Sequence, residues 1–334
     1  MDPSTLLATA PARIEGDLDS GYCEPFWYGE FHDHDAMLYR DLARDPVPAA
    51  TLRASTGGSP MRSKRYREFV APQGYDHELR AVFRTGDNTW GMASFYRQRG
   101  RSAFSPDDVA LLSAVSTTVG TALRTQAAAG VTPWPASANA PGLLFFDADD
   151  VLISANTEAA HWLGEAYGPP PGKGWVAVLA ERSGDDLRMP FPTIPLLVRA
   201  RAVAAGHGRG PARLRLRDGR GRWLVLHASC MPGTLAGDGG VAVVIEPAKS
   251  AEIAPIIIEA YGLTVRERDV MPHLALGLST PEMAAELYLS PHTIRDYVKA
   301  IFDKVGVSSR GELVAKLFAE HYADPMHEML VHAD

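Results

Sequence analysis

Between Leu263 and Val314, hydrophobic and polar residues repeat with the period of short amphipathic helices. Three hydroxyl residues in this stretch are each followed, three positions later, by a glutamate, which is the spacing of a capping box. The pairs are Thr264 with Glu267, Ser279 with Glu282, and Ser309 with Glu312. Ser290 followed by Pro291 marks one more helix start. The pattern therefore predicts an all-α module of four short helices with tight connections.

The helix expected after Ser290 has one hydrophobic side and one polar side. On a 3.6-residue wheel the hydrophobic stripe comprises Ile294, Val298, Ile301 and Val305. The opposite side carries His292, Arg295, Asp296, Lys299 and Asp303. The preceding helix, residues 280–287, offers Met283, Ala284 and Leu287 for burial, and Tyr288 and Leu289 leave only a short turn. This arrangement matches a helix-turn-helix that enters a major groove, although an ordinary amphipathic helix pair fits the same wheel.

The module resembles the LuxR-type helix-turn-helix domain of bacterial transcription regulators. The matching residues are Leu263-Thr264, Arg266-Glu267-Arg268, Gly277-Leu278-Ser279, Glu282-Met283-Ala284, Leu287, Leu289-Ser290, Thr293-Ile294-Arg295, Ile301, Lys304-Val305-Gly306-Val307, Ser309-Arg310 and Leu313-Val314. The resemblance implies that the helix after Ser290 is the recognition helix.

Roles for the polar residues follow from this reading. Arg295, Asp296 and Lys299 are predicted to reach base edges, since arginine and lysine suit guanine and a carboxylate accepts from cytosine. An alternative for Asp296 is a helix-stabilising partnership with Arg295 or Lys299. The remaining DNA-binding candidates are Ser290, His292, Thr293, Lys304 and Arg310. Of these, Thr293, Lys304 and Arg310 are expected at phosphates, and His292 at either kind of group.

Two residues depart from the family pattern. Tyr297 stands where the family often has histidine, beside the hydrophobic stripe, so we expect it to be tolerated. Pro272 falls inside the first helix of the module and is predicted to kink or split it, because proline removes a backbone hydrogen bond.

The charge of residues 263–334 is acidic. They contain seven lysines and arginines against eleven aspartates and glutamates. One copy thus lacks the basic surface that drives non-specific DNA affinity. We expect two copies on paired half-sites. The helix predicted over 311–322 supplies Leu313, Val314, Leu317 and Phe318, and in the resembling family the last helix pairs two subunits.

The first part of the chain, residues 1–128, predicts an α+β domain. Residues 77–85 and 90–97 alternate around the Gly86-Asp87-Asn88 turn, which indicates a hairpin. A long helix is predicted after Ser105, and a helical stretch over 25–43 precedes the hairpin. With Asp41-Leu42-Ala43-Arg44, Thr56-Gly57-Gly58 and Arg65-Tyr66-Arg67-Glu68, this region resembles the later part of a GAF domain in actinobacterial LuxR-type regulators. The opening helix and first strand of such a domain are missing from the pattern, so the domain is either truncated or abbreviated.

A second α+β domain is predicted over 141–247, after an Ala- and Pro-rich linker at 129–140. Strands are expected at 142–147, 151–155, 212–217, 223–228 and 241–246, with a helix capped by Asn156 between the second and third. This order, with the run Ser154-Ala155-Asn156, Ala159-Ala160 and Leu163-Gly164, resembles a PAS domain. A connecting helix is expected over 248–262, ahead of the helix-turn-helix domain at 263–334.

Composition places the chain among globular cytoplasmic proteins. Of its 334 residues 46% are hydrophobic and 22% charged, and the net charge is −7. No apolar run approaches the roughly 20 residues needed to span a bilayer, and the first residues lack a signal pattern. Cys23 and Cys230 stand far apart without metal-ligand neighbours, so neither a disulfide framework nor a zinc site is implied.

Several runs of residues that could suggest a metal, catalytic or ligand-binding site are interpreted as structural. His32-Asp33-His34-Asp35 is expected on a solvated helix surface, where adjacent side chains point about 100° apart and cannot chelate one ion. The pattern of a nucleophile elbow is not met by Gly57-Gly58-Ser59-Pro60. A hairpin turn is expected at Gly237–Gly240. The sequence has no phosphate-binding loop motif. Trp90, Phe95, Trp162 and Trp223 either line a ligand pocket or, as we expect, form plain core.

The sequence therefore predicts a non-enzymatic, sequence-specific transcription regulator controlled through its two sensor-type domains. Candidate partners are double-stranded DNA, a second copy of the chain, a small-molecule effector and RNA polymerase; no catalytic residue, cofactor or metal is predicted, and the ligand-binding residues stay unknown. Two alternatives remain open: an enzyme fused to a DNA-binding domain, and a protein-interaction scaffold whose terminal module has lost DNA binding.

Overall fold

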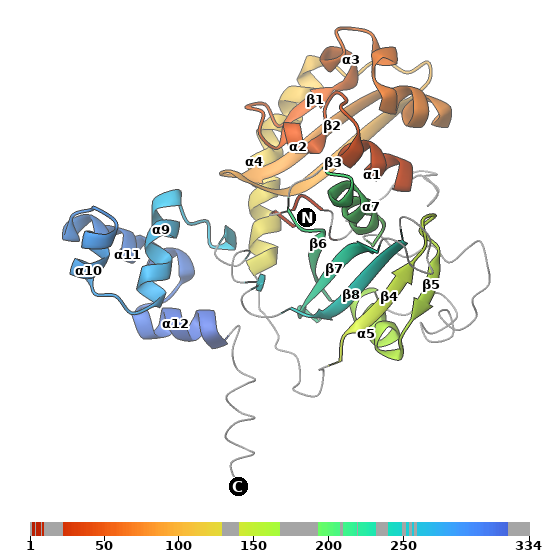
Figure 1. Cartoon of the computed structure of the whole chain (residues 1–334). Helices are drawn as coiled ribbons and strands as arrows, with labels where there is room; N and C mark the ends of the chain where they lie inside the picture. Colours follow the sequence, from red (N-terminus) through yellow and green to blue (C-terminus); the bar gives the residue numbers. More distant parts are fainter. Residues whose placement is uncertain are drawn as a thin grey trace. The chain divides into compact units, whose positions relative to one another are not determined.

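The computed structural model describes residues 2–3, 5–7, 9, 23–128, 140–167, 193–207, 210–218, 220–231, 240–248, 252–253, 256 and 259–319 (Figure 1). The chain divides into two compact units. The first comprises Met1–Leu123 and Asn139–Pro247, and the second comprises Arg124–Ala138 and Ala248–Asp334. None of the described helices has the length and hydrophobicity that a membrane span requires.

A three-stranded antiparallel sheet forms the first half of unit one. Its order is β1 (Ala49–Thr51), β2 (Tyr75–Thr85) and β3 (Asn88–Gln98). The predicted hairpin is confirmed, with Thr85 paired to Asn88 across the turn. Gly86 takes a positive φ of 60° there, which only glycine adopts without a steric cost.

The long helix α4 (Pro106–Ala128) covers one face of this sheet. Ser105 and Asp108 cap its start: the Ser105 amide donates to the carboxylate at 2.7 Å, and the Asp108 amide donates to the Ser105 hydroxyl at 3.2 Å. A Cβ added at Gly120 would lie 2.8 Å from the backbone of Arg84, so the glycine permits close packing of helix on strand. The helix predicted after Ser105 is confirmed. It includes Ala127 and Ala128; residues 129–139 of the predicted linker lie outside the described part.

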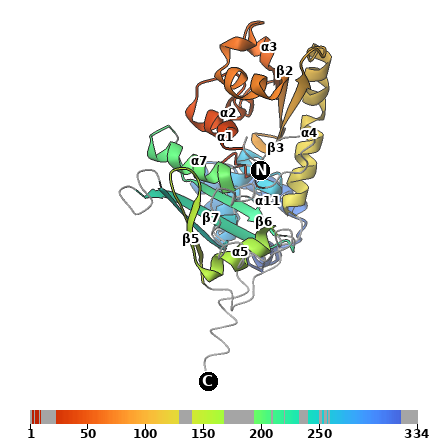
Figure 2. The same ribbon diagram turned by 90° about the vertical axis from the view of Figure 1, so that its right-hand side faces the viewer.

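Short helices cover the other face (Figure 2). They are α1 (Cys23–His32), α2 (Tyr39–Leu42), α3 (Leu52–Ser55), η2 (Pro60–Arg62), the π-turn η3 (Tyr66–Val70) and η4 (Ala71–Gln73). The helix predicted over 25–43 is interrupted between α1 and α2, where Met37 has a φ of +57° and is buried. Residues 10–22, where an opening element of this domain would be sought, are outside the described part.

A buried ionic cluster lies between these helices and the sheet, and sequence analysis did not predict it. Arg80 is fully buried; its Nε donates to Glu78 Oε1 at 2.6 Å, and its Nη1 donates to the Glu30 carboxylate. Arg65 donates from Nε and Nη2 to Glu78 Oε2 at 3.2 and 3.1 Å. Burial alone would raise the pKa of Glu78, but the two guanidinium groups lower it. Burial also raises the pKa of Tyr39, beside Arg80, to about 12.

The second half of unit one is a five-stranded antiparallel sheet of order β5-β4-β8-β7-β6. The strands are β4 (Gly142–Phe146), β5 (Leu152–Ala155), β6 (Arg213–Arg217), β7 (Trp223–Met231) and β8 (Gly240–Pro247). Helices α5 (Thr157–Tyr167) and α7 (Thr193–Ala204) lie between the second and third strands in sequence. Asn156 caps α5 by accepting from the Ala159 amide at 3.0 Å. All five predicted strands and the capped helix are confirmed. The predicted turn at Gly237–Gly240 lies almost wholly outside the described residues.

Helices α1 and α7 join the two halves of unit one. Trp27 of α1 packs with Ile194 and Val198 of α7 in one hydrophobic cluster. At the ends of these helices, Nδ1 of His32 lies 3.0 Å from Nδ1 of His207.

The structure corrects two expectations about single residues. Trp90, Trp162 and Trp223 are buried core as expected, but Phe95 is 40% exposed. His32-Asp33-His34-Asp35 is not a solvated helix surface, because α1 ends at His32 and the following carboxylates are engaged. Asp35 accepts from the hydroxyl of Ser63 and the amide of Arg65, both at 2.8 Å, and Asp33 pairs with Lys64 at 2.9 Å.

Candidate DNA-binding surface

In the described part of unit two, residues 265–319 form a module of four helices. They are α9 (Val265–Ala275), α10 (Thr280–Glu286), α11 (Pro291–Val305) and α12 (Arg310–Ala319). Thr264 with Glu267 and Ser279 with Glu282 form complete capping boxes, as predicted. The third pair is only half formed: the Ser309 hydroxyl accepts from the Glu312 amide at 3.1 Å, whereas the Glu312 carboxylate accepts from Ser308. Of the predicted connecting helix over 248–262, residues 249–251, 254–255 and 257–258 lie outside the described part, and the described residues 252, 253, 256, 259 and 260 are helical.

The predicted hydrophobic stripe of α11 holds the module together. Ile294, Ile301 and Val305 are buried, and Val298 is half-buried against the same cluster. Met283 and Ala284 of α10 and Val270, Met271 and Leu274 of α9 complete this core. The stripe therefore fixes which side of α11 faces outward.

A tight turn sets the position of α11 against α10. Tyr288 adopts a φ of +54° and is 94% exposed, while the Leu289 amide donates back to the Ala284 carbonyl at 2.9 Å. A left-handed backbone conformation is uncommon for a residue with a bulky side chain. Here it reverses the chain direction within two positions. The Ser290 hydroxyl then accepts from the Thr293 amide at 3.1 Å and starts α11. Ser290 and Thr293 thus cap the helix.

The polar side of α11 carries two kinds of residue. His292 and Asp296 form an exposed pair, with Nδ1 and Oδ2 3.1 Å apart. Asp296 thus has a helix partner, as in the alternative reading, but the partner is His292 rather than Arg295 or Lys299. Within the described residues Arg295 and Lys299 are exposed and form neither a hydrogen bond nor an ion pair. These two cations are therefore available to an anionic ligand.

Lys304 and Arg310, both predicted to contact DNA phosphates, form contacts within the module. Lys304 Nζ lies 2.6 Å from Oε2 of the buried Glu267. Nη2 of Arg310 donates to the Leu278 carbonyl. Burial alone would raise the pKa of Glu267, but hydrogen bonds from Lys304 and from the Thr264 amide outweigh it and lower the pKa. Both cations have structural roles, and their phosphate contacts stay predictions.

Pro272 lies within α9 without splitting it, contrary to one form of the prediction. Its carbonyl still accepts from Leu276 at 2.9 Å, so the helical hydrogen bonds resume after the proline. Tyr297 packs half-buried against the core, which agrees with its expected place beside the stripe.

Leu313, predicted for a dimer surface, is fully buried in the module's own core. The side chains of 315–319 and residues 320–322 of that predicted helix are outside the described part.

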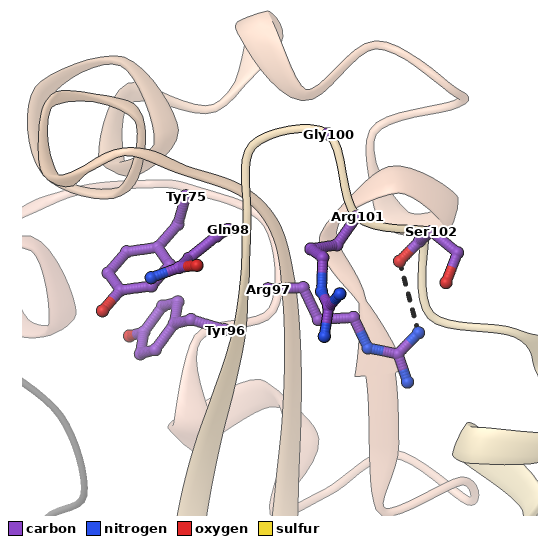
Figure 3. A pocket seen from close by; sticks show the side chains of 7 residues that line it. All are labelled: Tyr75, Tyr96, Arg97, Gln98, Gly100, Arg101 and Ser102. Atoms are coloured by element: carbon purple, nitrogen blue, oxygen red, sulfur yellow. Dashed lines mark hydrogen bonds between the residues drawn. The ribbon is translucent and has the colours of Figure 1, made fainter.

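Unit one has a hollow beside β3. It measures about 660 Å³ and is bounded by Tyr75, Tyr96, Arg97, Gln98, Gly100, Arg101 and Ser102 (Figure 3). The tyrosines and Gln98 lie on one side of β3, and the arginines lie on the other. Arg97 is also occupied, since its Nη1 donates to the Ser102 carbonyl at 3.2 Å. The polar groups do not converge, so the hollow is not assigned to a ligand.

Known proteins with a similar sequence match this module. Residues 262–317 match the family model "Bacterial regulatory proteins, luxR family". The spore germination protein GerE of Bacillus subtilis is 38% identical over 55 residues, which are 16% of this chain and 74% of GerE. The chain belongs to the luxR family of bacterial regulatory proteins.

Other similarities are narrower. The probable transcriptional regulatory protein NarL of Mycobacterium tuberculosis is 37% identical over 86 residues, which are 26% of this luxR-family chain. The chain thus spans only 37% of the length of NarL. A crystal structure of a phage VqmA–DPO complex aligns with 58% of this chain and 88% of that one at 18% identity, with a TM-score of 0.26. That score is too low to indicate a shared overall fold.

Proposed function

We propose that this luxR-family protein is a sequence-specific DNA-binding transcription regulator and that α11 is its recognition helix. The observation that supports this most directly is the outward face of α11. Its hydrophobic stripe is buried in the module, while Arg295 and Lys299 stay exposed and unpaired within the described residues. Arginine and lysine presented from one helix suit the guanine edge in a major groove.

The caps at the start of α11 support a phosphate contact there. The first backbone amides of a helix attract anions, and Ser290 and Thr293 add two hydroxyls whose oxygens lie 2.8 Å apart. We propose Arg295 and Lys299 as the principal base contacts. Asp296 and His292 neutralise one another when His292 is protonated, so we propose that they adjust specificity rather than supply affinity.

We further propose that the protein acts as a cytoplasmic homodimer with sensor-type domains in unit one. The acidic balance of residues 263–334 supports dimerisation, because one copy neutralises few phosphates. The antiparallel order β5-β4-β8-β7-β6, with the described helices α5 and α7 between its second and third strands in sequence, supports a PAS-like assignment. A hairpin backed by a long helix supports a GAF-like assignment for residues 1–128. A small molecule or protein signal would act by shifting the population of DNA-competent dimers.

A mobility-shift assay on the region upstream of the protein's own gene tests the DNA-binding proposal. Lys299→Ala and Arg295→Ala should each weaken specific binding by about 5- to 150-fold, equivalent to about 1–3 kcal/mol. Arg266→Ala is the matched control, because Arg266 is exposed on α9 and the substitution removes the same charge. It should change binding less than threefold.

Running the assay at several salt concentrations separates base contacts from general electrostatics. Equal losses for Arg266→Ala and Lys299→Ala at every salt concentration would remove α11 as the reader. Absence of any sequence-specific shift would favour the scaffold alternative.

A further inference from the structure

Tyr288, in the turn between α10 and α11, combines two features that are unfavourable for a tyrosine. It is 94% exposed, the highest exposure among the large hydrophobic side chains of the described residues. Its φ of +54° also lies in the left-handed region, where a bulky residue is strained. Tyr288 does not belong to the module's hydrophobic core, so packing does not hold the ring in place.

The turn requires the left-handed conformation but not an aromatic side chain. The Leu289 amide donates to the Ala284 carbonyl at 2.9 Å, and Leu289 then packs against the core. This is the Schellman arrangement at the end of a helix, in which the left-handed position is usually a glycine. Glycine would adopt the conformation of Tyr288 without strain. A backbone outlier that a commoner residue would relieve is an indication of function.

The turn places Tyr288 beside the polar start of α11. Ser290, two positions later, caps α11 by accepting from the Thr293 amide at 3.1 Å. The hydroxyl oxygens of Ser290 and Thr293 lie 2.8 Å apart, and His292 is exposed in the same first turn. Hydroxyl groups and the first amides of a helix are donors that proteins use at phosphates. The Tyr288 hydroxyl adds one more uncharged donor next to this group, on a longer side chain.

We propose that Tyr288 contacts the sugar-phosphate backbone of DNA, with its hydroxyl donating to a phosphate oxygen and its ring lying against the adjacent deoxyribose. This inference rests on the proposed function of α11. A recognition helix that enters a major groove brings the residues just before it to the edge of the groove, where the phosphates lie. A contact of this kind fixes the position of the helix and adds affinity, but it carries no sequence information. Its role is therefore distinct from that of Arg295 and Lys299.

Tyr288→Phe in the full-length protein tests the proposal, because it removes the hydroxyl and keeps the ring. In a mobility-shift assay on the duplex upstream of the protein's own gene, it should bind about 3- to 10-fold more weakly than wild type. The loss should be similar on a scrambled duplex of the same length, since a phosphate contact acts on any sequence. A neutral hydroxyl displaces no counterion, so the salt dependence of binding should stay as in wild type, whereas Lys299→Ala should reduce it.

Tyr288→Gly separates a role in DNA binding from a role in folding. It removes the ring and relieves the backbone strain, so its Tm should be about 2–4 °C above that of wild type. Its DNA binding should nevertheless be at least as weak as that of Tyr288→Phe. Tyr28→Phe is the matched control, because it removes the hydroxyl of a partly exposed tyrosine of α1 in unit one, and it should bind DNA as wild type does.

The proposal is overturned if Tyr288→Phe binds both duplexes within twofold of wild type, and the exposed ring would then be assigned to a protein partner. It is also overturned if Tyr288→Gly melts below wild type, because the tyrosine would then stabilise the turn. A wild-type protein without a sequence-specific shift would refute the proposed function instead. In that case the comparison on the scrambled duplex at low salt still decides the Tyr288 contact, and a wild type that binds neither duplex overturns both.

Discussion

Nζ of Lys304 lies 2.6 Å from Oε2 of Glu267, and this contact ties the end of α11 to the first turn of α9. The same carboxylate oxygen accepts from the Thr264 amide at 2.7 Å, so one buried glutamate both caps α9 and holds α11. The orientation of the polar face of α11 therefore depends on a residue that is not part of that face.

Glu267→Gln should destabilise the module by about 1–3 kcal/mol, because the amide keeps the shape but loses the charged partner of Lys304. The folded-state pKa of Glu267 is lowered from its ordinary value of 4.5, so the contribution of its charge is present above pH 4.5 and lost as pH falls below it. Urea unfolding at pH 7 and pH 4 checks both points. The exposed Glu286→Gln is the control and should change the unfolding free energy by less than 1 kcal/mol. A Glu267→Gln module as stable as wild type at pH 7 would refute the role.

Lys304→Met should lower thermal stability more than Lys299→Ala does, since Lys304 is bound to Glu267 and Lys299 is exposed without a partner in the described part of the chain. If Lys304 also contacts a phosphate, its replacement would in addition reduce the slope of the logarithm of the DNA-binding constant against the logarithm of the salt concentration by about 1. Melting curves and salt titrations of both variants distinguish these roles. If Lys304→Met leaves melting unchanged and reduces only the salt slope, Lys304 is a phosphate contact and not a structural tie.

Arg80→Met should destabilise unit one by about 3–5 kcal/mol, because it leaves the buried Glu30 and Glu78 without their shared cation. Arg99→Met removes the same kind of side chain from an exposed pair with Asp76, and should cost at most about 1 kcal/mol. Denaturant unfolding followed by tryptophan fluorescence compares the two, since Trp90 lies buried in the same sheet. Similar losses for both variants would contradict the energetic importance of the buried cluster.

The pair of His32 and His207 should make the junction of α1 and α7 sensitive to acid. Burial lowers the pKa of His32, and the neighbouring His207 lowers it further. The folded-state pKa thus lies below its ordinary value of 6.5, so the stability involved is present above pH 6.5 and is lost as pH falls below it. Between pH 7 and pH 5 the Tm of His32→Asn should fall by less than the Tm of wild type. The variant His34→Asn, at an exposed position, should behave as wild type. An identical acid response in all three proteins would rule out the pair as its cause.

The secondary structure followed from local chemistry. Hydroxyl–glutamate spacings located the starts of α9 and α10, and the turn at Gly86 and the cap at Asn156 located β3 and α5. Each of these signals depends on residues only a few positions apart, so it can be recognised from the sequence alone. The same holds for the buried stripe of α11, because helical period alone decides which side chains share a face.

The sequence by itself indicated the luxR-type module, its polar face and the described strands other than β1, the three-residue strand Ala49–Thr51. Only the tertiary structure decided that Lys304 and Arg310 are engaged within the module, that Leu313 lies in its core and that Glu30, Arg65, Glu78 and Arg80 form one buried cluster. The contact of Asp2 with Arg215 likewise joins residues 213 positions apart. A charged side chain carries no local sign of its partner, and whether it binds a ligand or another residue depends on which distant segment the fold brings within about 3 Å.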